Sequence, residues 1–287
     1  TQRQVIILIP LPSNWENIYD PNASTLVMGI LNVTIDSFSD GGQFFHKEIA
    51  VKHALEMEKD GADIIDIGGE STRPGAEPVT IEEELERVIP IIEAIRSASD
   101  ICISIDTYKA VVGEKALGSG AELVNDHSGL QFDEKMVHVV STENVPVIIM
   151  HIKGTPINMQ QDPNYDNLME EIVAYFQERV KFCHEHDIKN HNIILDPGIG
   201  FGKRLKDNFE LIRELNDISD LGFPVLSGPS RKSFIGLTLN LPIEKRMEGT
   251  AAAVTASIMN GAKIVRVHDV KEMKRVVTIA DNIRGMA

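Results

Sequence analysis

Apolar and polar positions follow one recurring unit along this chain, starting at Leu26. Each unit opens with a short apolar run, continues through a polar or glycine-rich segment, and ends in an amphipathic stretch of helical period. The runs predict strands at Leu26–Leu31, Ile64–Ile67, Ile101–Ile105, Leu123–Val124, Val147–Met150, Ile193–Leu195, Val225–Leu226 and Ile264–Val267. The periodic stretches predict helices at Ile49–Lys59, Ile81–Ile95, Tyr108–Leu117, Glu134–Val140, Leu168–Glu185, Phe209–Leu215, Glu244–Met259 and Glu272–Ile283.

Strands and helices that alternate in this way predict an α/β fold, a single (β/α)8 TIM barrel with a short N-terminal extension. The strands are continuous apolar runs, as expected for strands buried on both faces. An open doubly wound sheet is the alternative, but it usually has fewer strands and a phosphate loop after the first one. We therefore expect an extension over residues 1–25 and a catalytic barrel over residues 26–287.

Composition narrows the class of protein further. The chain is 43% hydrophobic and 25% charged, which is typical of a protein with a large core. Its net charge of −15, with no block of Lys or Arg, argues against a nucleic-acid partner. No apolar run reaches the roughly 18 residues of a membrane helix, so no membrane partner is expected. Cys102 and Cys183 are far apart in sequence and predict reduced core thiols in a cytoplasmic protein.

Two connections are unusually long and rich in Gly, Ser, Asp and Pro. They run from Asn32 to about Lys47 and from Gly68 to about Thr80. Long loops in a compact fold are usually functional, so we expect both to act as lids over the active site.

Polar side chains follow every predicted strand, where a barrel carries its active site. In chain order they are Asn32; Glu70, Ser71, Thr72 and Arg73; Asp106; Asn125 and Asp126; His151; Asp196; Ser230, Arg231, Lys232 and Ser233; and Arg266 and His268. Any one of them could instead cap a helix or shape a turn. Together, however, they place charges at one mouth, where charge must be paired or used.

Two chemistries are favoured by these residue types. Arg73, Arg266 and His268 can bind a phosphate or pyrophosphate, and Asn32 is a neutral oxygen ligand suited to Mg²⁺. For a planar heterocycle with N–H and amino groups, the chain offers a second set, made of Asp106, Asn125, Asp196 and Lys232. The segment 196–203 is glycine-rich but does not match a phosphate-loop spacing, so we interpret it as a tight turn close to a ligand.

With these residues in place, the chain resembles the dihydropteroate synthase family of pterin-binding barrels. The matching motifs are Met28-Gly-Ile-Leu-Asn-Val-Thr-Ile-Asp-Ser-Phe-Ser-Asp-Gly-Gly42, Asp66-Ile-Gly-Gly-Glu-Ser-Thr-Arg-Pro-Gly-Ala76, Ser104-Ile-Asp-Thr107, Asn125-Asp126, Met150-His151, Asp196-Pro-Gly-Ile-Gly-Phe-Gly-Lys203, Ser230-Arg-Lys-Ser-Phe-Ile-Gly236, Gly249-Thr-Ala-Ala-Ala253 and Arg266-Val-His-Asp-Val270. They occur in order, one or more in each barrel unit, so the resemblance covers the chain from residue 26 onward.

The resemblance implies a transferase of folate biosynthesis. Such an enzyme condenses 6-hydroxymethyl-7,8-dihydropterin pyrophosphate with p-aminobenzoate, uses Mg²⁺, is inhibited by sulfonamides, and forms a homodimer. By similarity, the pterin would be held by Asp106, Asn125, Met150, Asp196, Phe201 and Lys232. Thr72, Arg266 and His268 would bind pyrophosphate, Asn32 would serve as the magnesium ligand, and Arg73 and Ser233 would lie beside p-aminobenzoate. The groups expected to act in catalysis are Asp36, Arg73, Asp196, Lys232, Arg266 and His268.

Two positions depart from the family pattern. Ile35 stands where the first loop usually has Pro, which removes a fixed φ and predicts a looser lid. His127 stands where the family tends to have a small aliphatic residue, and we expect it to be a partly exposed residue at a helix entry. Corrinoid methyltransferases with a similar barrel are an alternative, but they would not need the segments 70–76 and 230–233. A non-catalytic pterin-binding module would be expected to lose Arg266 and His268.

Overall fold

The structure is a computed structural model that describes residues 11, 15, 18–20, 22–33 and 43–285. Parallel strands form a closed barrel in the order β1-β2-β3-β4-β5-β6-β7-β8, and β8 pairs with β1. The strands are β1 (Leu26–Asn32), β2 (Ile64–Gly68), β3 (Cys102–Asp106), β4 (Leu123–Asp126), β5 (Val147–Met150), β6 (Ile193–Asp196), β7 (Val225–Ser227) and β8 (Ala262–Val267). The predicted TIM barrel is therefore confirmed, with strand ends that differ from the prediction by a residue or two.

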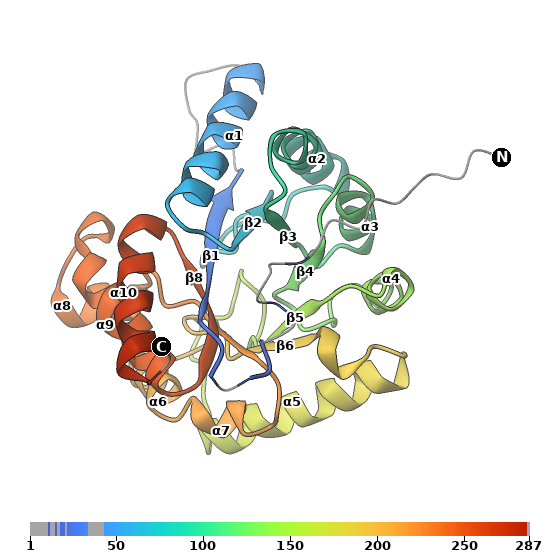
Figure 1. Cartoon of the computed structure of the whole chain (residues 1–287). Helices are drawn as coiled ribbons and strands as arrows, with labels where there is room; N and C mark the ends of the chain where they lie inside the picture. The colour runs from blue at the N-terminus through green and yellow to red at the C-terminus, as the bar shows by residue number, and fades with distance from the viewer. Residues whose placement is uncertain (1–10, 12–14, 16–17, 21, 34–42, 286–287) are drawn as a thin grey trace.

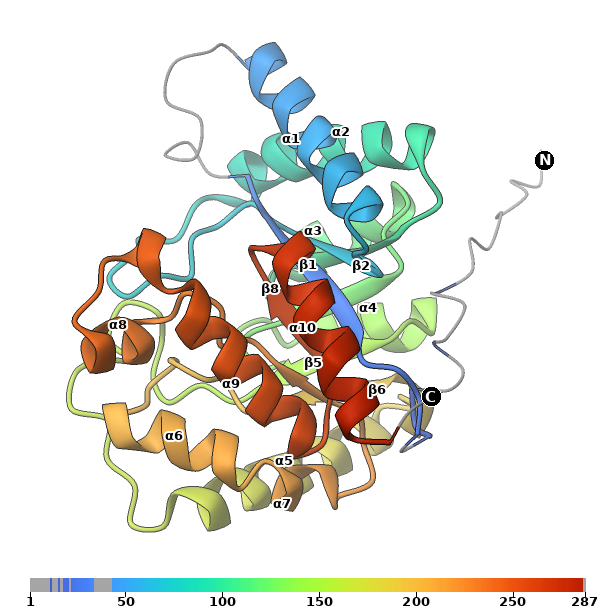
Figure 2. The same cartoon turned by 60° about the vertical axis from the view of Figure 1, so that its left-hand side comes forward.

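Helices surround the strands as an outer ring, as Figures 1 and 2 show. They are α1 (Gln43–Lys59), α2 (Ile81–Ala98), α3 (Ala110–Gly118), α4 (Met136–Glu143), α5 (Leu168–Glu185), α6 (Leu205–Arg213), α7 (Asn216–Ser219), α8 (Ser233–Leu239), α9 (Met247–Met259) and α10 (Val270–Ile283), with 3-10 turns η3 (Asn190–Asn192) and η4 (Ile243–Lys245). The short helices α7 and α8 were not predicted, and α1 begins before the expected end of the first loop. Residues 34–42, with Ile35 and Asp36, lie outside the described residues.

Two apolar layers hold the barrel together. The outer layer packs the strands against the helices, for example through Ile65 and Val88. The inner layer lies inside the barrel and contains one or two side chains from each strand: Leu26, Met28, Ile64, Cys102, Leu123, Ile148, Ile194, Leu226 and Ile264. Successive side chains of a strand point to opposite faces, so the residue two positions after each of these also points inward.

The described part of the N-terminal extension closes the end of the barrel where the strands begin. Trp15 and Ile18 are buried and pack into the inner layer. Lys263 donates to the carbonyl of Asp20 over 2.7 Å, and Thr25 donates to Asp281 over 2.7 Å. The apolar inner layer is thus covered at this end, and the other end is left for polar side chains.

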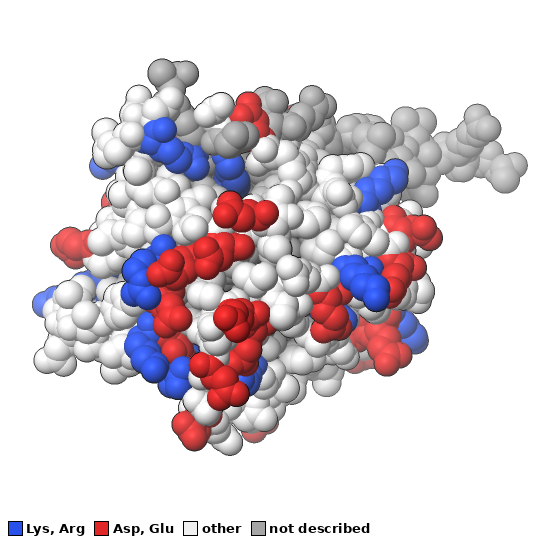
Figure 3. All heavy atoms as spheres, turned by 90° about the horizontal axis from the view of Figure 1, so that it is seen from below, with Lys and Arg blue, Asp and Glu red and all other residues white. Residues whose placement is uncertain are grey.

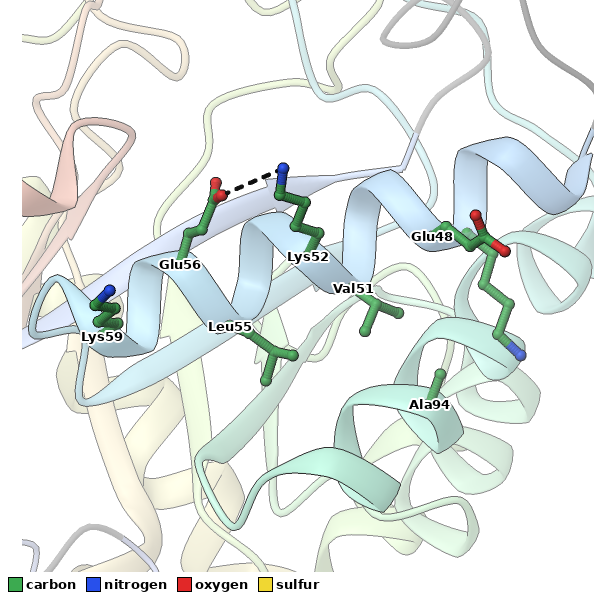
Figure 4. A pocket seen from close by; sticks show the side chains of 8 residues that line it. Glu48, Val51, Lys52, Leu55, Glu56, Lys59 and Ala94 are labelled. Carbon is green, nitrogen blue, oxygen red and sulfur yellow. Dashed lines mark ion pairs between the residues drawn. The ribbon is translucent and has the colours of Figure 1, made fainter.

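The outer surface carries charges of both signs. On the face drawn in Figure 3, basic side chains lie among acidic ones. A groove of about 670 Å³ is lined by residues that all belong to α1 and α2. Its apolar part is formed by Val51, Leu55 and Ala94 (Figure 4). It lies on the helix layer and contains no strand-end residue. Among the described helices, none is both long and apolar enough to cross a membrane.

Candidate active site

The strand register brings the predicted polar residues to one mouth of the barrel. Asp106 lies four residues after the inner-layer residue Cys102, and Asn125 lies two residues after Leu123. Met150, Asp196 and Arg266 likewise lie two residues after the inner-layer residue of their own strand. All of these side chains therefore point into the barrel, on the mouth side of its apolar filling.

Arg266 is the centre of a charged cluster that joins β2, β3, β4 and β8. Its Nε donates to Oδ2 of Asp66 over 2.6 Å, and its Nη2 donates to Oδ2 of Asp106 over 2.8 Å. Nδ2 of Asn125 donates to the same Asp66 oxygen over 3.0 Å. The predicted pyrophosphate residue Arg266 thus contacts the predicted pterin residue Asp106, so the two predicted sets of residues adjoin each other. Sequence reasoning missed Asp66, although a carboxylate inside the run Ile-Ile-Asp-Ile is itself an unusual buried charge.

The protonation of this cluster follows from burial and charge. Burial raises the pKa of Asp66 above its ordinary value, and the positive charge of Arg266 only partly opposes this. Burial also acts on Asp106, but the hydrogen bond from His127 and the charge of Arg266 outweigh it and lower the pKa of Asp106. The two aspartates raise the pKa of Arg266 despite its burial. At neutral pH the site therefore holds an ionised Asp106 beside a guanidinium.

A second charged pair faces this cluster from β6 and the β7–α8 connection. Burial raises the pKa of Asp196 and lowers the pKa of Lys232 to about 8, and the opposite charge of each partner resists both shifts. The Lys232 ammonium donates to the carbonyl of Ile199 and lies 4.6 Å from the centre of the Phe201 ring. Ser233 follows Lys232 and is exposed at the first residue of α8.

An apolar wall adjoins these polar groups. Met150, Ile152 and Met159 form a separate buried cluster, and Phe201 packs against it. Tyr175 holds the end of β5 by donating to the Met150 carbonyl over 2.9 Å. Thioether and ring carbons next to buried carboxylates and amides fit a planar heterocycle with polar edges.

Lys203 holds the glycine-rich turn after β6 in place. The sequence showed only that this lysine does not fit the spacing of a phosphate loop, and it did not indicate this structural role. Its ammonium lies 2.9 Å from Nδ1 of His151 and donates to the carbonyls of His151, Gly198 and Phe201 over 2.9 to 3.3 Å. Burial lowers the pKa of Lys203 to about 7 and that of His151 to about 2. Gly198 has a φ of +68°, and a Cβ there would lie 1.9 Å from the His151 carbonyl oxygen, which explains the glycine.

The remaining predicted anion ligands lie at the rim. His268 follows β8, and its Nδ1 is 3.0 Å from Oγ of Ser230. Burial, together with the charge of Arg266, lowers the pKa of His268 to about 4, so at neutral pH it offers hydrogen bonds rather than a charge. Thr72 is half-buried and Arg73 is exposed, both in the connection after β2.

An ion triad fastens that connection to the helix layer. The Lys109 ammonium donates to Glu70 over 2.7 Å, to Glu84 over 2.6 Å and to the carbonyl of Val79 over 2.7 Å. Further along, the Gly75 amide donates to the carbonyl of Pro156, in the connection after β5, over 3.1 Å. The segment with Thr72 and Arg73 is therefore held at both ends, and Arg73 is exposed between them.

The magnesium prediction depends on Asn32, the last residue of β1 and a half-buried side chain. Its Oδ1 lies 3.8 Å from the position that a Cβ on Gly68 would take, so the glycine leaves space beside the amide oxygen. Within the residues described, no cluster of three or more His, Cys, Asp or Glu side chains could hold a metal. The single amide oxygen of Asn32 is a neutral oxygen donor, which suits a Mg²⁺ ion that takes most of its ligands from water and a bound phosphate group.

His127 does not lie where we expected it. It is only 4% exposed, and its Nδ1 is 3.4 Å from Oδ1 of Asp106. The expectation of a partly exposed residue at a helix entry was wrong, because the chain after β4 turns inward through hydrogen bonds from Ser128 and Leu130 to the carboxylate of Asp126.

Fold and site together define a barrel enzyme that binds a planar heterocycle beside an anion. Residues 28–268 match the family described as pterin binding enzyme. A dihydropteroate synthase of Clostridium beijerinckii is 51% identical over 260 residues, which cover 90% of this chain and 94% of that protein.

Solved structures agree with this match. A Yersinia pestis dihydropteroate synthase in a sulfonamide drug complex has a TM-score of 0.86 and 44% identity, covering 91% of this chain and 95% of that one. A Xanthomonas albilineans dihydropteroate synthase in complex with 7,8-dihydropteroate has a TM-score of 0.83 and 37% identity, covering 93% and 96%. The chain belongs to the dihydropteroate synthase family.

Proposed function

We propose that this chain joins the methylene carbon of 6-hydroxymethyl-7,8-dihydropterin pyrophosphate to the amine nitrogen of p-aminobenzoate. The carbon–oxygen bond to pyrophosphate breaks, the carbon–nitrogen bond forms, and the amine loses a proton. The products are 7,8-dihydropteroate and pyrophosphate. The observation that carries the proposal is the contact of Arg266, an anion-binding cation, with Asp66 and Asp106 beside Asn125. This contact supports binding of the leaving group and the heterocycle next to each other.

The pterin ring would lie across the mouth with its polar edge on the carboxylates. Asp106, Asn125 and Asp196 would accept from and donate to the ring nitrogens and the amino group, and Lys232 would donate to a ring carbonyl or nitrogen. Met150 and Phe201 would cover the ring face, as their place in the apolar wall supports.

Bond breaking would precede amine attack. The leaving group departs from a methylene attached to an electron-rich ring, so ionisation gives a delocalised cation. The ionised Asp106 and the Asp196 carboxyl would favour that positive charge, and Arg266, with hydrogen bonds from Thr72 and His268, would favour the charge on departing pyrophosphate. The attacking aromatic amine is already neutral at pH 7, so it needs no general base.

The p-aminobenzoate side would be formed by Ser233 and Arg73, which are both exposed at the mouth. Arg73 would join Asp36, whose loop is outside the described residues, in covering the reacting atoms. Sulfonamides would compete at this subsite, as the sulfonamide complex of the Yersinia pestis relative supports.

Mg²⁺ would be held by Asn32 and by the pyrophosphate of the substrate. When bound, the ion would supply positive charge that stabilises the pyrophosphate oxygens.

We further propose a homodimer in the cytoplasm. The support for a dimer is a set of exposed apolar side chains on neighbouring helices α8, α9 and α10: Leu237, Leu239, Met259, Ile279 and Ile283. Analytical ultracentrifugation would test it, since a monomer at micromolar concentration would contradict the proposal.

The test of the reaction is product formation by the purified chain. Supplied with pterin pyrophosphate, p-aminobenzoate and Mg²⁺, it should release pyrophosphate and dihydropteroate in equal amounts, measured by chromatography. Asp196→Asn should weaken pterin binding by roughly tenfold to a hundredfold, because a buried charged hydrogen bond is lost. The exposed Asp187→Asn is the matched control and should behave as the unchanged protein. Intact pterin binding without product would refute the synthase proposal.

A further inference from the structure

The side chain of His127 occupies a position that the reaction above does not use. It comes directly after β4, and its Nδ1 faces Oδ1 of Asp106 at 3.4 Å. Arg266 takes the other carboxylate oxygen at 2.8 Å. Both oxygens of Asp106 thus have a side-chain partner, one from β8 and one from the end of β4.

Aromatic rings hold the imidazole in this orientation. Tyr108 and Phe132 pack edge-to-face on it, with ring centres 5.3 and 6.3 Å away. No described residue makes a hydrogen bond to Nε2 of His127. Within the described part of the chain, the contact with Asp106 is therefore the polar interaction that accounts for a buried histidine here, since a buried polar ring without one is costly.

We propose that His127 is a positioning residue of the pterin site, which acts by fixing the carboxylate of Asp106 for the ring. The inference rests on the proposed function, because it assigns Asp106 to the pterin. A carboxylate with only one hydrogen-bonded oxygen can rotate about its Cβ–Cγ bond. The contact with His127 restricts this rotation before the pterin binds. An aliphatic side chain at this position would leave Oδ1 without this partner.

The charge of His127 also bears on the site. The titratable groups around the imidazole are Asp106 on β3, Asp126 on β4, Glu70 in the connection after β2 and Tyr108 in the connection after β3. Burial lowers the pKa of His127, but the hydrogen bond and the charge of Asp106 outweigh it and leave the pKa raised. An imidazolium offsets part of the negative charge on Asp106, so the neutral ring should leave a stronger acceptor for the pterin.

Two substitutions separate the hydrogen bond from the charge. His127→Val removes both, whereas the amide of His127→Asn can replace Nδ1 but never titrates. The probe is 6-hydroxymethylpterin, which lacks pyrophosphate, with calorimetry for its affinity and steady-state assays for both substrates. The valine variant should bind the probe about tenfold more weakly, and the asparagine variant should bind within about threefold of the unchanged protein. The KM of p-aminobenzoate should stay the same in both.

The pH profile supplies a readout that a purely structural role would not move. Between pH 6 and 9, the affinity of the unchanged protein for the probe should rise relative to that of His127→Asn as His127 loses its proton. His53→Asn, an exposed histidine on α1, is the control and should follow the unchanged protein. Parallel profiles, or equal losses for pterin and p-aminobenzoate, would overturn the inference. If His127→Val does not fold, the asparagine profile decides alone. The probe needs no turnover, so failure of product formation is a separate result.

Discussion

Removal of Arg266 should destabilise the folded protein in a way that depends on pH. The guanidinium makes ionic hydrogen bonds of 2.6 and 2.8 Å, and the side chains of Asp66 and Asp106 are only 0% and 12% exposed. Breaking a buried ion pair typically costs about 3–5 kcal/mol, because the remaining charge is left without its partner. Since Asn125 and His127 still contact the aspartates, we expect Arg266→Met to lose about 3 kcal/mol of unfolding free energy at pH 8.

The sign of the pH effect follows from Asp66. Burial already raises its pKa in the folded state, and the charge of Arg266 is the largest opposing influence. Without Arg266 the pKa of Asp66 rises further, so the folded variant binds a proton that the unfolded chain does not bind until lower pH. The folded variant therefore gains stability as the pH falls through that raised pKa, and the deficit should be smaller at pH 5.5 than at pH 8.

Urea unfolding followed by circular dichroism at both pH values measures the two deficits. Arg213→Met is the control, because its pair with Glu214 is exposed and should contribute less than about 1 kcal/mol. A deficit below about 1 kcal/mol at pH 8, or equal deficits at the two pH values, would show that the cluster is not the buried ion pair described here.

Two more outcomes test the pterin side of the site. Because burial lowers the pKa of Lys232 to about 8, its positive charge is present below that pH and lost above it. The affinity for 6-hydroxymethylpterin should therefore fall between pH 7 and 9, whereas Lys232→Gln should show no such fall, and identical slopes would contradict the assignment. Gly198→Ala should abolish pterin binding or folding, because the new Cβ would lie 1.9 Å from the His151 oxygen at a φ of +68°. An alanine variant with wild-type affinity in the same calorimetric titration would disprove that constraint.

Much of this architecture could be predicted from the sequence because the strands are buried on both sides. Their apolar runs stand out, and the polar residue that ends each run marks the mouth of the barrel. Helix α8 could not be predicted in this way, because its seven residues, with Gly236 in the middle, are too few to show a helical period. Which side chains form hydrogen bonds with one another in the site could not be predicted from the pattern of apolar and polar residues either. Arg266 and Asp106 are 160 positions apart, and only closure of the barrel brings them into contact.

The burial of His127 and Lys203 could not be predicted from the sequence either. Each looked like an ordinary polar residue next to a turn, and each is buried against carbonyls or carboxylates in the structure. Whether a polar side chain faces solvent or the interior depends on how its turn is fastened. Here Asp126 and Gly198 determine those turns, through hydrogen bonds for the first and a left-handed backbone for the second.

Trp15 is the single tryptophan of the chain, and it lies at the end of the barrel opposite the polar mouth. Its fluorescence emission therefore reports on the packing at that end of the barrel, away from the predicted substrate residues. The same packing bears on how the chain can be shortened for expression. A fragment that starts at Leu26 would uncover the inner layer to water, and we expect such a fragment to aggregate.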